Sequence, residues 1–273
     1  MQSRMETAAC PDASNLKKNV SGRSIVLLTA LTFLALLSAP SVARAETITV
    51  SVAASLADAF KQIAASYQKT QPADTVHLNL GASGSLLQQI KKGAPVDVLA
   101  TADEATMIHA EHAGLMKEVG RPFATNTLVL IQPMETNHPM VSLANLQAEN
   151  IRRVAIGNPV TVPVGRYTRQ ALESAGLWPT LQQKLIMGHS ARQVLDYVAR
   201  DEVDAGFVYG TDADLMKGKV KVAHTIPLEP GITYFIAATK RAENKPAAQR
   251  FVNYVLSPAS QQILSDYGFR PAK

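Results

Sequence analysis

The chain has 273 residues, of which 47% are hydrophobic, 18% are charged and only 5% are aromatic. Its formal net charge is +5, but five basic and two acidic residues lie in residues 1–45, so residues 46–273 carry only +2. So small a charge, with few aromatic residues and no basic stripe, excludes the electrostatic footprint of a nucleic-acid-binding protein. The length fits one large domain or two modest α/β lobes.

The first 45 residues have the layout of a secretory signal peptide. Basic residues at positions 17, 18 and 23 precede an uncharged, mostly apolar run at 25–37, and the small-x-small sequence Ala-Arg-Ala follows at 43–45. The apolar run is shorter than the ~20 residues that a membrane-spanning helix needs. We therefore predict that residues 1–45 are removed by cleavage after Ala45 and that the rest is exported to the periplasm.

Cys10 is the only cysteine and lies in this predicted signal peptide. The exported protein is thus expected to contain no disulfide, no thiolate nucleophile and no thiolate metal site. No cysteine follows the apolar run, which argues against a lipid-anchored protein.

Strands and helices alternate along the first half of the exported chain. Apolar or β-branched runs predict strands at 48–53, 76–80, 96–101 and 127–132. Small or hydroxyl residues end most of these runs, and segments with helical spacing follow the first three. Asp103 is predicted to be the N-cap of the helix that follows the third strand.

The same pattern restarts after a polar loop near residue 140. Further strands are predicted at 153–156, 185–187, 205–209 and 232–239, and two C-terminal helices at 246–267. Alternating strands and helices predict mostly parallel sheets flanked by helices, and the restart predicts two such lobes.

Ligands of open α/β sheets bind beyond the carboxyl ends of the strands, where loops turn into helices. The residues at these junctions are Ser55, Ser83, Val164, Ala191 and the strand-end Tyr209, all uncharged and mostly small. The first N–H groups of a helix have no intrahelical acceptor and carry partial positive charge. Several such junctions around one cleft can hold a dianion with neutral donors alone. The competing interpretation makes Ser55 and Ser83 ordinary N-caps and leaves the Tyr209 hydroxyl in water.

Two other constellations are weaker. His109 and His112 have the i, i+3 spacing of metal ligands, but two histidines on an exposed helix with no further ligand are usually solvated. Ser83, His189 and Asp212 make a Ser-His-Asp set on paper, yet the Gly-x-Ser-x-Gly elbow of serine hydrolases is missing.

Taken together, the junction sequences resemble those of the periplasmic molybdate-binding proteins of ABC transporters, over residues 48 to 269. The resemblance rests on Ala-Ala-Ser-Leu at 53–56, Gly-Ala-Ser-Gly-Ser at 81–85, Gly-Asn-Pro at 157–159, Val-Pro-Val-Gly-Arg-Tyr at 162–167 and Val-Tyr-Gly-Thr-Asp-Ala at 208–213. It implies a two-lobed, periplasmic-binding-protein-like α/β fold joined by a hinge. Lobe I is expected to comprise residues 46–125 and 233–273, and lobe II residues 126–232, with hinge crossings near 125–127 and 232–234.

The resemblance also implies how the ligand is held. Ser55 and Ser83 of lobe I would bind the oxyanion through their hydroxyl and N–H groups. Lobe II would contribute the backbone N–H groups of Val164 and Ala191 and the phenol of Tyr209. No residue is expected to ligate a metal cation directly, and no cofactor is expected.

The function implied is capture of molybdate, and of tungstate, for an inner-membrane ABC permease by a monomeric protein that is not an enzyme. An alternative is a sulfate, thiosulfate or phosphate carrier of the same fold, which charged residues in the cleft would favour. Arg166 and Arg192 flank the predicted donors, and we expect both to point outward. An alternative of another class is an enzyme on a bilobal fold, which needs an acid, base or nucleophile in the cleft.

Overall fold

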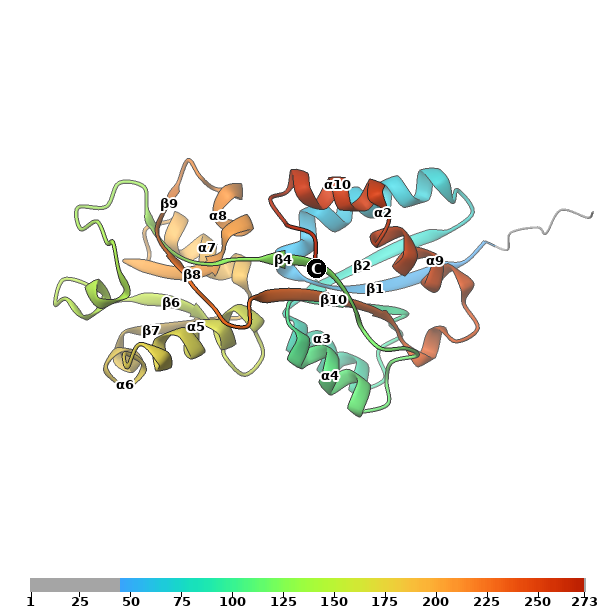
Figure 1. The fold of residues 1–273 in the computed structure, drawn as a ribbon, viewed down its shortest axis with the longest axis horizontal. Coiled ribbons are helices and arrows are strands. Elements are labelled where there is room, and N and C mark those ends of the chain that lie inside the picture. The colour runs from blue at the N-terminus through green and yellow to red at the C-terminus, as the bar shows by residue number, and fades with distance from the viewer. Residues whose placement is uncertain (1–44, 273) are drawn as a thin grey trace, which may run out of the picture. The chain divides into compact units, whose positions relative to one another are not determined.

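The computed structural model describes residues 45–272 (Figure 1). The predicted signal peptide therefore lies outside the described residues, apart from Ala45. None of the helices in residues 45–272 is long and apolar enough to cross a membrane.

Lobe I is the part of the chain built on a five-stranded sheet with the strand order β2-β1-β3-β10-β4. Its strands are β1 (Thr47–Ala53), β2 (Thr75–Gly81), β3 (Val98–Thr101), β4 (Arg121–Asn126) and β10 (Ile232–Ala238). β1 pairs in parallel with β2 and β3, whereas β10 pairs antiparallel with β3 and β4. One strand of this sheet thus runs against the other four, as expected for a mostly parallel sheet.

Helices cover both faces of this sheet. They are α2 (Ala57–Thr70), α3 (Ser83–Lys91), α4 (Glu104–His112), α9 (Pro246–Val255) and α10 (Pro258–Asp266), with short 3-10 turns at η1 (Ala54–Leu56) and η4 (Lys240–Ala242). Figure 1 shows α2, α9 and α10 on one face and α3 and α4 on the other. Each helix buries an apolar stripe; on α2 this is the predicted face from Ala59 to Tyr67.

Lobe II is built on a second five-stranded sheet with the strand order β7-β6-β8-β5-β9. Its strands are β5 (Leu128–Pro133), β6 (Val154–Gly157), β7 (Leu185–Gly188), β8 (Ala205–Tyr209) and β9 (Val220–Ile226). Its helices are α5 (Pro163–Ser174), α6 (Trp178–Leu181), α7 (Ala191–Ala199) and α8 (Gly210–Leu215), with 3-10 turns at η2 (Leu143–Gln147) and η3 (Gln182–Lys184). Here β5 runs against the other strands, so the two sheets share one design.

The chain passes from one sheet to the other twice (Figure 1). The first passage is Thr127, between β4 and β5, and the second is residues 227–231, between β9 and β10. The first passage joins the end of β4 to the start of β5, and the second leads into the start of β10. Because the start of β10 pairs with the end of β4, these three strand ends lie beside one another. The predicted lobe ranges and hinge positions stay predictions.

The predicted strands are present, but two further strands are not anticipated by the sequence patterns. β4 and β9 each lie at an edge of their sheet. β4 begins with an exposed Arg-Pro pair, and β9 carries polar residues that water reaches. Edge strands tolerate proline and polar side chains, so their apolar signal is weak.

Candidate functional site

The five predicted site residues lie around one small cavity between the lobes. Ser55, Ala191 and Tyr209 line it directly, and Ser83 and Val164 each follow a lining residue in the chain. All five are buried. At about 10 Å³ the cavity holds about one water molecule.

Neither serine of lobe I is a helix cap, so the N-cap interpretation is wrong. Ser55 lies in the middle of η1, and Ser83 is the first residue of α3. The caps are Ala53, Leu56 and Ala82, none of which makes a side-chain capping bond. The two hydroxyls are therefore available for something other than ending a helix.

The hydroxyl of Ser83 is held so that it donates toward the cavity. The backbone N–H of Ala102 donates to Ser83 Oγ over 3.0 Å. Because the oxygen already accepts a hydrogen bond, the hydroxyl proton remains for an acceptor in the cavity.

The hydroxyl of Ser55 is oriented by a longer chain of hydrogen bonds. The N–H of Thr127 donates to Asn126 Oδ1 (2.9 Å), which fixes the orientation of the amide. Asn126 Nδ2 then donates to Tyr234 Oη (3.1 Å), and Tyr234 Oη shares a hydrogen bond of 3.2 Å with Ser55 Oγ. Because the phenol oxygen already accepts from Asn126, this arrangement favours donation from Tyr234 to Ser55, which leaves the Ser55 proton for an acceptor in the cavity. Sequence reasoning missed Asn126 and Tyr234, whose only signal was their place beside the two passages.

Tyr209 presents an unpaired phenol to the cavity. Its side chain is 1% exposed, and its Oη has no hydrogen-bond partner among residues 45–272. Burial raises the pKa of this phenol well above its ordinary value of 10, so it is a protonated donor. The interpretation that leaves its hydroxyl in water is wrong. Since buried polar groups are nearly always paired, an unpaired donor lining a cavity indicates a ligand with an acceptor oxygen.

Two helix starts of lobe II complete the donor set. Val164 is the second residue of α5, after Pro163, and Ala191 is the first residue of α7, after its N-cap Ser190. N–H groups in the first turn of a helix have no intrahelical acceptor, and the helix dipole makes this end partly positive. Both helices therefore offer N–H groups to a negatively charged ligand.

Arg166 and Arg192 do not point outward, contrary to the prediction. Arg166 crosses to the carboxylate of Asp103 in lobe I, and Arg192 donates to Asp58 in lobe I over 3.0 Å. Neither lines the small cavity, whose described walls carry no charged side chain. The feature that would favour a sulfate or phosphate carrier is therefore missing from these walls.

The described residues do not assemble the metal-ligand set or the Ser-His-Asp set considered above. Among residues 45–272 there is no cluster of three or more ligands for a metal ion, and His109 and His112 are exposed on α4. Ser83 is engaged with the backbone of Ala102, and no hydrogen bond of the described residues joins it to His189 or Asp212.

Asp212 is a buried carboxyl beside this site. It is fully buried, neither oxygen has a hydrogen-bond partner in the described part of the chain, and Arg192 Nε lies 3.9 Å from Oδ1. Burial raises the pKa of Asp212 from 3.8 to about 6, although the charge of Arg192 opposes the shift.

We expect Asp212→Asn to stabilise the fold at high pH only. As the pH rises from about 4 to 6, the unfolded chain loses this proton before the folded chain does, so wild-type stability falls. Above pH 6 the variant should gain up to about 3 kcal/mol in free energy of unfolding, and below about pH 4 nothing. Urea unfolding above pH 6 and below about pH 4 measures this gain in free energy of unfolding. Asp214→Asn, which changes an exposed neighbour, is the control. An equal gain at both pH values would contradict the assignment.

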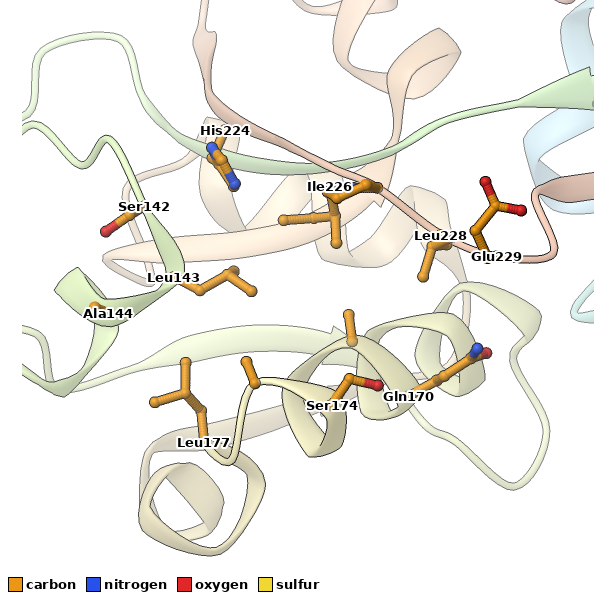
Figure 2. Close-up of a pocket in the computed structure, with 13 residues that line it drawn as sticks. Ser142, Leu143, Ala144, Gln170, Ser174, Leu177, His224, Ile226, Leu228 and Glu229 are labelled. Atoms are coloured by element: carbon orange, nitrogen blue, oxygen red, sulfur yellow. The ribbon is translucent and has the colours of Figure 1, made fainter.

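A larger cavity lies elsewhere in the described residues. It has a volume of about 670 Å³ and lies in lobe II, between α5, η2 and the segment that leads from β9 toward β10. Figure 2 shows Gln170 and Ser174 of α5 across from Ile226 and Leu228 of this segment. None of the five predicted residues lines it, and the carboxylate of Glu229 at its edge disfavours an anion there.

Comparisons with known proteins agree with this architecture. The family model of the bacterial extracellular solute-binding proteins matches residues 48–270. The molybdate-binding protein ModA of Haemophilus influenzae is 31% identical over 235 residues, which cover 84% of this chain and 92% of ModA. The periplasmic molybdate-binding protein of Azotobacter vinelandii superimposes with a TM-score of 0.71 at 23% identity, covering 83% of this chain and 100% of that one. The sulfate-binding protein SubI of Mycobacterium tuberculosis also gives 0.71, at 15% identity, with 84% and 88% covered.

The two structural likenesses are below 25% identity and support the fold alone, whereas the family model spans most of the chain. A solute-binding family also argues against the enzyme alternative. The chain belongs to the bacterial extracellular solute-binding protein family.

Proposed function

We propose that this protein binds molybdate in the cavity between its lobes and delivers it to an ABC permease. The observation that carries the proposal is the buried, protonated phenol of Tyr209, which has no partner in the described residues and lines a cavity shared by both lobes. The identity of 31% with a molybdate-binding protein, over most of both chains, supports the choice of ligand.

The chemistry of the proposed donors favours a fully deprotonated tetrahedral anion. Ser55, Ser83 and Tyr209 would each donate one hydroxyl proton, and Val164 and Ala191 would donate backbone N–H groups. Hydrogen bonds to a charged acceptor are roughly twice as strong as neutral ones. A protonated phosphate would also need an acceptor, and none of the five residues is a carboxylate.

Discrimination against sulfate would depend on size. A cavity that closes around the longer metal–oxygen bonds of molybdate leaves a smaller anion out of reach of some donors, and each buried donor left unpaired costs about 1 to 3 kcal/mol. Tungstate is nearly the same size as molybdate, so we propose that the site also takes tungstate.

Capture would proceed by closure of the lobes. We propose that lobe I (46–125 and 233–273) and lobe II (126–232) move about the two passages between the sheets, so that the anion meets one lobe first and the other completes the donor set. The small size of the cavity supports this order of events, because the anion must enter an open form. We further propose a monomer exported to the periplasm by cleavage of residues 1–45, acting without a cofactor.

Thermal unfolding with different oxyanions tests the proposal. A ligand at 1,000 times its dissociation constant adds roughly 4 kcal/mol to the free energy of unfolding, which gives a large rise in melting temperature. We expect this rise with molybdate and tungstate, and none with sulfate, phosphate or chloride at equal ionic strength. A rise in melting temperature with sulfate or phosphate alone would show that this anion, and not molybdate, is the ligand. No rise with any anion would refute the proposed function.

A further inference from the structure

Two arginines beside the proposed donors cross from lobe II to lobe I. Arg166 lies two residues after Val164, in the first turn of α5. Its Nε donates to Asp103 Oδ2 over 2.8 Å, its Nη2 donates to the same carboxylate oxygen, and Nη2 also donates to Thr106 Oγ1 over 2.8 Å. The Asp103 side chain is only 5% exposed, so this contact is largely shielded from water.

Arg192 makes the second crossing and directly follows Ala191. Its Nη2 donates to Asp58 Oδ2 over 3.0 Å. Asp58 lies in the first turn of α2, three residues after Ser55. Burial acts to raise the pKa of Asp58, but hydrogen bonds from Lys61 and Arg192 outweigh it and lower the pKa, so the carboxyl is ionised.

The Arg192–Asp58 pair also lines a cavity that adjoins the small one. A neighbouring cavity of about 380 Å³ is lined by Asp58, Lys61, His189 and Arg192, and shares Ala54, Ala82 and Ser190 with the small one. The pair thus lies between the two lobes and close to the proposed donors.

We propose that the Arg166–Asp103 and Arg192–Asp58 pairs form a latch that holds the two lobes shut over the anion. The four residues are positioning residues, and none of them lines the small cavity. Arg166, Arg192 and Asp58 each lie within three residues of a proposed donor, and Asp103 directly follows Ala102, whose N–H donates to Ser83. The proposal deepens the proposed function and rests on it for the identity of the anion, but not for the contact between the lobes. Opening the lobes breaks both pairs, so the latch slows release.

A simpler explanation is that the arginines only attract a dianion. The two explanations predict opposite changes in anion affinity when an aspartate partner is neutralised. Neutralising Asp58 or Asp103 makes the site less negative, so simple attraction predicts tighter anion binding. A latch predicts weaker binding, because a partner of each arginine is lost. Asp103→Asn is suitable because asparagine remains a good N-cap for α4, where Asp103 Oδ1 accepts from the N–H of Thr106.

The test measures dissociation constants and dissociation rates of sodium molybdate for Asp58→Asn, Asp103→Asn, Arg192→Gln and the double variant Asp58→Asn/Arg192→Gln. We expect binding about two- to fivefold weaker for the half-exposed Asp58 pair, and about three- to tenfold weaker for the more buried Asp103 pair, mainly through faster release. The double variant should bind no more weakly than Arg192→Gln alone. Glu173→Gln, which breaks the exposed pair with Arg169 inside lobe II, is the matched control and should bind as wild type does.

A second measurement does not depend on which anion binds. The N–H of Gly84 in lobe I donates to the carbonyl of Thr161 in lobe II over 3.0 Å, so its hydrogen exchange reports on lobe opening. Without any anion, exchange at Gly84 should be faster in Asp58→Asn and Asp103→Asn than in Glu173→Gln. Unchanged exchange, or equal or tighter molybdate binding by both aspartate variants, would overturn the latch. If wild type does not bind molybdate, the proposed function fails and the exchange measurement alone decides on the latch.

Discussion

Replacing Gly84 with alanine is expected to weaken molybdate binding by about 100-fold or more, which is the loss of two hydrogen bonds to a charged ligand. A Cβ built on Gly84 would lie 2.7 Å from the carbonyl oxygen of Thr161, closer than non-bonded atoms approach. The obstacle is backbone of the other lobe and has no flexible end to move aside. The lobes can then no longer meet beside Ser83, and the N–H group of Val164 is held away from the anion.

The binding loss should come without a loss of stability. Gly84 is the second residue of α3, and alanine favours a helix over glycine by about 1 kcal/mol. The thermal midpoint without anion should therefore stay the same or rise, while isothermal titration with sodium molybdate shows weak or no binding. Gly218→Ala is the matched control, because nothing lies within 4 Å of its added Cβ. Binding by Gly84→Ala within a factor of a few of wild type would show that the lobes do not close at this contact.

The site could be predicted from the sequence where the information is local. Each predicted donor follows a strand and lies before or within the first turns of a helix, so strand and helix patterns alone pointed to residues that the fold brings together around the small cavity. The alternation of patterns also predicted two mostly parallel sheets flanked by helices, without the edge strands β4 and β9. A strand at an edge needs no continuous apolar run, so its pattern resembles that of a loop.

What the sequence could not show depends on contacts between distant segments. Tyr234 is 179 residues from Ser55, and only the arrangement of the two passages brings the phenol to the serine. The arginines were misjudged for a similar reason. An arginine near the start of a helix is normally expected to face water, but here the other lobe supplies a carboxylate from 63 residues away for Arg166 and 134 for Arg192.

The fold also determines how the hydroxyls of Ser55 and Ser83 are oriented for hydrogen bonding. Ser83 accepts from the N–H of Ala102, and Ser55 shares a hydrogen bond with the phenol of Tyr234, so the fold favours donation by both serines to a ligand. A site of donors alone is suited to an anion without protons, and it is poorly suited to a ligand that must itself donate. In the proposed site, the orientation of the two hydroxyls would therefore depend on Ala102, which lines the cavity, and on Tyr234, which does not.

Tyr209→Phe is expected to change binding and stability in opposite directions. The variant removes one hydrogen bond to a charged ligand, so molybdate should bind about 10- to 100-fold more weakly. Without anion, wild type carries a buried phenol oxygen that has no partner in the described residues, and removing it should leave the melting temperature unchanged or raise it.

Tyr254→Phe provides the contrast that separates a ligand-binding phenol from a structural one. The phenol of Tyr254 shares a hydrogen bond of 2.7 Å with Ser66, on lobe I and away from the cavity. Its loss should lower the free energy of unfolding by about 1 kcal/mol and leave molybdate binding unchanged. If Tyr209→Phe behaved in this way instead, losing stability and keeping its affinity, the phenol would be a packing group, and the anion would have to be held by the serines and helix starts alone.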